Sequence, residues 1–113
     1  MSVSAAFTPT GNTVVINAAT SYPNAVQAPS NTGTSMQYRI INSSTTQGCF
    51  LSFAQSKAAA EANCLVPNTS VSTAVIHILP NTDEILTFTP TTWFTAITAA
   101  NSCTLYLTPG DGM

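Results

Sequence analysis

The sequence predicts an all-β fold, a single antiparallel β-sandwich of seven or eight strands with extended terminal arms. Short apolar stretches recur along the 113 residues and are separated by turn-forming residues, at a spacing of roughly nine to fifteen residues. The chain has 19 Thr, 12 Ser and 9 Asn but only 5% charged residues, so the Lys and Glu typical of helix surfaces are nearly missing. Jelly-roll and immunoglobulin-like topologies both fit this pattern.

The clearest strand is expected at residues 35–42. Here Tyr38 and Ile40 alternate with Gln37 and Arg39, which is the period-2 pattern of a half-buried strand, and Met36 shares the apolar face. The remaining strands are expected at 13–17, about 25–28, 49–54, 71–79, 84–89, 93–98 and 103–108.

A single domain is expected over residues 1–113, with an N-terminal arm at about 1–12 and a C-terminal tail at about 108–113. The one helix-like piece is 56–62, which we interpret as a turn of helix or a loop, with Ser56 as its candidate N-cap.

The charge content excludes several partners. Arg39 and Lys57 are the only basic residues and the net charge is -2, so no phosphate-binding patch can form and nucleic acid is not an expected partner. No stretch contains the about 18 consecutive apolar residues that a membrane-spanning helix needs. The first residues have neither a basic segment nor a long apolar stretch, so we expect no secretion signal and synthesis in the cytoplasm.

The sequence gives no positive indication of an enzyme. His77 is the single histidine and lies within an expected strand, where a structural, hydrogen-bonded role is the simpler interpretation. Asp83 and Glu84 are neighbours in an extended segment, so they point to opposite faces and do not form an acid–base pair. We therefore expect no catalytic residues, no metal site and no cofactor.

The three cysteines, Cys49, Cys64 and Cys103, are odd in number and widely spaced. This spacing does not match a metal site or a complete disulfide framework. Each lies in an apolar stretch, so we interpret them as buried thiols that pack as small hydrophobic side chains.

Six segments of the chain form a recognisable set: 7–16, 36–42, 49–53, 78–88, 94–98 and 104–112. Together they resemble a group of small tailed-bacteriophage proteins that end in a strand followed by a Thr-Pro-Gly-acidic-Gly tail. The likeness extends from Phe7 to Gly112, and Asn81 replaces the Gly that usually follows the Leu-Pro pair in this group.

This resemblance implies a structural virion protein, a capsid cement or decoration protein that binds the outer capsid lattice and stabilises it. Its expected partners are the major capsid protein and further copies of itself, with a trimer favoured over a dimer. The expected location is the capsid surface of the virion, after synthesis in the host cytoplasm. The alternative is a phage tail or head-fibre module that binds a host-surface glycan.

Four residues are candidates for partner binding. Tyr22 lies in the polar 18–34 segment, and Trp93 is the single tryptophan and a candidate aromatic anchor. Phe7 and Asp111 belong to the two terminal arms, which could reach neighbouring subunits or pair with a sheet edge.

Overall fold

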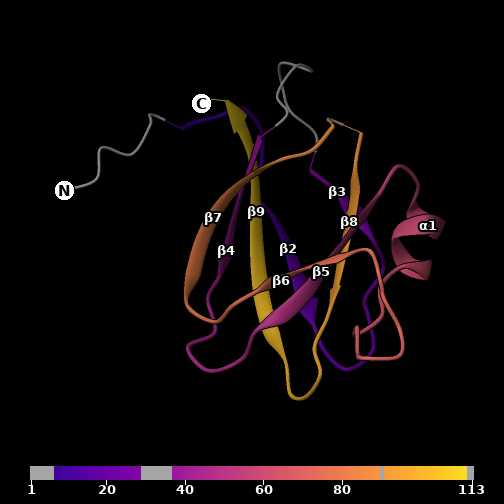
Figure 1. Ribbon diagram of the computed structural model, residues 1–113. Coiled ribbons are helices and arrows are strands. Elements are labelled where there is room, and N and C mark those ends of the chain that lie inside the picture. The colour runs from indigo at the N-terminus through magenta and orange to yellow at the C-terminus, as the bar shows by residue number, and fades with distance from the viewer. Residues whose placement is uncertain (1–6, 29–36, 90, 112–113) are drawn as a thin grey trace.

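The computed structural model describes residues 7–28, 37–89 and 91–111, and in these parts the chain forms two antiparallel β-sheets packed face to face (Figure 1). One short helix, α1 (Lys57–Ala62), lies beside the second sheet. The strands within the described parts are β1 (Thr8–Pro9), β2 (Val14–Ala18), β3 (Val26–Gln27), β4 (Gln37–Asn42), β5 (Cys49–Ala54), β6 (Val75–Ile78), β7 (Thr82–Thr87), β8 (Trp93–Ile97) and β9 (Cys103–Asp111). The prediction of an all-β sandwich is confirmed.

The order of the strands identifies the topology as a jelly roll. Sheet A has the order β1-β9-β4-β7, with β2 also paired to β9, and sheet B has the order β3-β8-β5-β6. The pairs β2·β9, β3·β8, β4·β7 and β5·β6 are nested, as in one long hairpin of four strand pairs. Wrapping that hairpin adds the pairs β4·β9 and β5·β8, which close the two sheets. The immunoglobulin-like alternative is therefore wrong.

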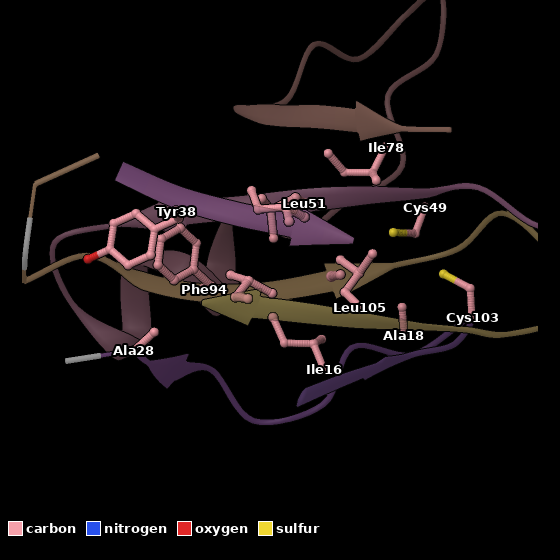
Figure 2. Packing of buried hydrophobic residues seen from close by; sticks show 13 residues of the cluster. Ile16, Ala18, Ala28, Tyr38, Cys49, Leu51, Ile78, Phe94, Cys103 and Leu105 are labelled. Atoms are coloured by element: carbon pink, nitrogen blue, oxygen red, sulfur yellow. The ribbon is translucent and has the colours of Figure 1, made fainter. Parts of the chain in front are cut away.

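The core lies between the sheets and is built by the alternation that the sequence predicts. Tyr38 and Ile40 of β4 are buried, whereas Gln37 is half-buried and Arg39 is exposed. The ring of Tyr38 meets the ring of Phe94 of β8 edge-on, with their centroids 5.1 Å apart. Figure 2 shows the core cluster, whose members are Ile16, Ala18, Ala28, Tyr38, Ile40, Cys49, Leu51, Ile78, Phe94, Ala96, Cys103, Leu105 and Leu107.

The strand expected at 71–79 is shorter in the structure, because a turn occupies its first part. The side-chain Oδ1 of Asn68 accepts hydrogen bonds from the backbone N–H groups of Ser70 and Val71, at 2.8 and 2.9 Å. Local side-chain bonds of this kind compete with a strand ladder. Only β6, four residues long, remains as the edge strand of sheet B.

β7 begins two residues earlier than the expected strand at 84–89. Asn81 adopts a left-handed backbone conformation, with φ of 56°, and its N–H donates to the carbonyl of Ser44 at 2.7 Å. Asn tolerates this conformation better than most residues with a side chain. The turn after Pro80 thus forms with an asparagine at its left-handed position.

The expected terminal arms are partly incorporated into sheet A. Residues 108–111, expected in the tail, continue β9, and Thr8 and Pro9 pair with its last residues. Gly110 permits this contact, because a Cβ atom there would lie 2.6 Å from the carbonyl oxygen of Thr8 and closer still to the ring of Phe7. Residues 1–6 and 112–113 lie outside the described residues.

The helix confirms the prediction for 56–62. Ser56 is its N-cap, and the Ser56 hydroxyl accepts a hydrogen bond from the N–H of Ala59 at 3.1 Å. Ala60 is buried, and its carbonyl accepts a 2.6 Å hydrogen bond from the hydroxyl of Ser52 in β5. These contacts hold α1 against the outer face of sheet B.

We expect Phe94→Ala to lower the free energy of unfolding by about 3–5 kcal/mol, because it removes a fully buried ring that contacts both sheets. Urea denaturation of the variant measures this loss. Val15→Ala is the control, since Val15 is 47% exposed and its truncation should change stability far less. A similar loss in both variants would contradict the described core.

Candidate functional site

The outer face of sheet A is a regular surface that the pairing of β2, β9, β4 and β7 builds. Its central row runs across four strands as Val15, Tyr106, Ile41 and Asp83, each directly opposite the next. Val15 is 47% exposed and Tyr106 is 38% exposed, so this row presents apolar side chains to solvent.

A second row, next to the first, mixes hydroxyl, charged and apolar side chains. Thr108 of β9 lies opposite Arg39, which lies opposite Ile85 of β7, and Ile85 is 38% exposed. The hydroxyls of Thr13 and Thr108 are 2.6 Å apart and hydrogen-bonded. Neighbouring threonine hydroxyls therefore partly satisfy one another's hydrogen-bonding capacity.

Asn17 and Thr104 form a third, polar row. They lie opposite each other, and the hydroxyl of Thr104 donates to Oδ1 of Asn17 at 3.2 Å. We call the three rows the sheet A face, which consists of Thr13, Val15, Asn17, Arg39, Ile41, Asp83, Ile85, Thr104, Tyr106 and Thr108.

The two charges on the sheet A face neutralise each other. The guanidinium of Arg39 donates to both carboxylate oxygens of Asp83, with Nη2 2.5 Å from Oδ2 and Nε 3.0 Å from Oδ1. The hydrogen bond from Arg39, together with its charge, lowers the pKa of Asp83 below its usual value. Glu84, the next acid in β7, lies opposite buried Ile40 and thus on the core side.

The outer face of sheet B is largely covered by the protein itself. Glu61 of α1 accepts a hydrogen bond from the N–H of Ala25 at 2.8 Å and pairs with Lys57 at 3.2 Å. Cys64, just after the helix, is buried and hydrogen-bonded to Thr95 of β8. Because α1 and the segment after it occupy this side, the sheet A face is the better candidate for a partner.

The four residues predicted to bind partners do not lie on the sheet A face. The structure brings Phe7 and Asp111 together, since the Phe7 ring lies against Gly110 and Thr8 pairs with Asp111. Tyr22 is 43% exposed in the connection before β3, and Trp93 begins β8 in sheet B. Their role in partner binding stays a prediction.

Sequence reasoning missed the apolar members of the sheet A face, Val15, Ile41, Ile85 and Tyr106. Each stands in an expected strand and alternates with core residues, so the period-2 pattern marks it as outward. The pattern does not show that the four strands are neighbours. That information comes only from the pairing of segments far apart in the chain.

His77 lies on β6, on the outer side of sheet B. It is exposed, and its imidazole stacks on the ring of Phe50 with centroids 4.6 Å apart. Within the described ranges no carboxylate forms an ion pair with it, and no group of three or more His, Cys, Asp or Glu could hold a metal ion. In the described geometry the imidazole of His77 therefore has the ring of Phe50 as its stacking neighbour.

Comparison of the chain with protein-family models, with curated proteins and with solved structures gives no match. Among the helices of the described residues, none has the length and apolar character needed to cross a membrane. Function is therefore inferred from the sheet A face and the fold.

We expect the stability of the protein to fall below about pH 4.5 through protonation of Glu61. The N–H of Ala25, and then Lys57, lower the pKa of Glu61 in the folded state. A lowered folded-state pKa gives stability above the unfolded-state pKa, which is lost as the pH falls toward the folded-state value. In urea unfolding between pH 7 and pH 3, Glu61→Gln should show a flatter pH dependence.

Lys57→Met is the matched control for this pH dependence. It leaves the Ala25 hydrogen bond in place, which is the largest cause of the pKa shift, so most of the wild-type dependence should remain. Equal dependence in Glu61→Gln and wild type would exclude Glu61 as the responsible group.

Proposed function

We propose that the protein is a structural virion protein of a tailed bacteriophage, a cement or decoration protein that binds the outer capsid lattice and stabilises it. The observation that carries this proposal is the sheet A face, a pleated surface of threonines and apolar side chains with one neutralised charge pair. The resemblance of the sequence to small tailed-phage proteins supports the same function.

The chemistry of the sheet A face suits a surface that a partner covers. Desolvating an unpaired charge is costly, whereas the exposed parts of Val15, Tyr106 and Ile85 favour burial. The hydroxyls of Thr104 and Thr108 can donate or accept hydrogen bonds across an interface without that cost.

The jelly-roll topology is compatible with this function but does not establish it. Double-sheet jelly rolls occur in viral capsid domains and in lectins, and a fold by itself does not determine a function. The occupant that we propose for the sheet A face is the outer surface of the major capsid protein. A trimer would place three such faces around a local threefold junction of the coat lattice.

We expect Tyr106→Glu to weaken binding to capsids at least about tenfold, because complex formation would then bury an unpaired carboxylate at the centre of the sheet A face. Co-sedimentation of the purified protein with capsids of the encoding phage measures the affinity.

Leu79→Glu is the control for this variant. Leu79 is 52% exposed and lies in the connection between β6 and β7, outside the sheet A face, so the variant should bind capsids like wild type. Circular dichroism should show the same fold in both variants. Unchanged binding of Tyr106→Glu would rule out the sheet A face as the contact.

The second candidate function, glycan binding by a tail or head-fibre module, is favoured by the surroundings of Trp93. This side chain is half-buried between Gln27 and Ala54 of the neighbouring strands. The side-chain amide of Gln27, which lies directly opposite Trp93, donates to the carbonyl of Thr91 at 3.0 Å, so an amide group belongs to the surroundings of Trp93. Aromatic rings bordered by such polar groups can stack on sugars and hydrogen-bond them.

We expect Trp93→Ala to leave capsid binding unchanged, since Trp93 belongs to sheet B. Co-sedimentation measures this, and a glycan array with wild type and Trp93→Ala gives the complementary test. Glycan binding by wild type that disappears in Trp93→Ala, together with no capsid binding by wild type, would favour the second function and exclude the first.

A further inference from the structure

Two of the three cysteines face each other across the core. Cys49 is the first residue of β5 in sheet B, and Cys103 is the first residue of β9 in sheet A. Figure 2 shows both side chains extending from their strands into the space between the sheets, and both cysteines are free thiols. Each thiol perturbs the pKa of the other, which indicates that the two sulfur atoms lie near each other.

The surroundings of the pair are apolar. Cys49 lies opposite Ile78 in the β5·β6 ladder, and Cys103 lies opposite Ala18 in the β2·β9 ladder. All four residues belong to the core cluster. The described residues place no third metal-binding side chain with this pair, so its chemistry is that of two thiols.

We propose that Cys49 and Cys103 form a reversible disulfide bond that joins sheet A to sheet B under oxidising conditions. Both thiols belong to the core cluster and extend from opposite sheets into the space between them, so the bond requires an approach of two strand ends. This proposal does not depend on the proposed capsid function.

The oxidant is hydrogen peroxide, and the reaction balances as two thiols and one hydrogen peroxide giving one disulfide and two waters. The first thiolate attacks a peroxide oxygen, the O–O bond breaks, and a sulfenic acid and one water form. The second sulfur then attacks the sulfenic sulfur, the S–O bond breaks, and the second water leaves with the remaining thiol proton. A dithiol reductant reverses the reaction by thiol–disulfide exchange.

Cys103 is the first thiol to react. It is 5% exposed, whereas Cys49 is fully buried, and the thiol of Cys49 can donate a hydrogen bond to a thiolate on Cys103. Burial raises the pKa of both thiols, so the thiolate is scarce at neutral pH and oxidation should be faster at alkaline pH. Both residues begin strands at the same end of the sandwich (Figure 1), where opening of the adjoining loops can admit the oxidant.

Cys64 is an internal control for this reaction. It is also buried, but it lies on the outer side of sheet B, where its thiol is hydrogen-bonded to Thr95 and not to another thiol. Burial raises the pKa of Cys64 to about 11. A disulfide that forms only between two neighbouring thiols should therefore leave Cys64 reduced.

The test is oxidation of the folded full-length protein with dilute hydrogen peroxide, followed by non-reducing peptide mapping. Digestion with trypsin and a Glu-specific protease separates the three cysteines, since cleavage falls after Arg39, Lys57, Glu61 and Glu84. The expected product links peptide 40–57 to peptide 85–113, is two hydrogens lighter than the sum of the two, and disappears with dithiothreitol. Peptide 62–84, which carries Cys64, should remain a free thiol.

The oxidised protein should also unfold at a higher temperature, by about 5 °C or more, because the bond restricts the unfolded chain. Cys64→Ala should retain both the link and the stabilisation, whereas Cys103→Ala should lose both. If Cys103→Ala does not fold, the peptide map of the oxidised wild-type protein alone tests the proposed disulfide. A link that involves Cys64, a link between two chains, three unreacted thiols, or a Cys49–Cys103 link that forms only in urea would overturn the proposal.

Discussion

The ladder between β4 and β9 is the interaction on which the rest of the structure depends. It places Ile40 opposite Leu107 on the core side, and Ile41 opposite Tyr106 on the outer side. A slip of one residue would move the first pair into solvent and the second pair into the core. The burial of the core therefore also determines the composition of the sheet A face, and the two surfaces of the sheet cannot vary independently.

The difference between a local alternation pattern and long-range strand pairing explains which parts of the fold could be predicted from the sequence. The strand at 49–54 was predicted with its observed bounds, because its alternation is local and turns flank it. The error at 71–79 arose because the Asn68 turn competes with the ladder through side-chain hydrogen bonds, which an apolar pattern does not reveal. The choice of a jelly roll depends on pairs such as β2·β9, whose partners lie at opposite ends of the chain.

The candidate site was harder to predict than the fold for a related reason. The large aromatics Tyr22 and Trp93 were selected as single residues, but a face is a property of neighbouring strands. The meeting of Cys49 with Cys103 was likewise hidden by their separation in the sequence, and both were correctly predicted only as buried thiols. In each case the sequence shows the residue types but not which distant strands pair, or in which register.

The position of Glu84 has a consequence for how copies of this protein can associate. Among the described residues β7 is an edge strand of sheet A, and Glu84, which carries a carboxylate, lies opposite Ile40 and thus on the core side. A foreign strand that extended the sheet past β7 would enclose this carboxylate between two layers, which opposes edge-to-edge growth. Open-ended fibres that grow by strand addition at β7 are therefore disfavoured. Copies of the protein can still associate through the sheet A face, and such contacts give assemblies of limited size.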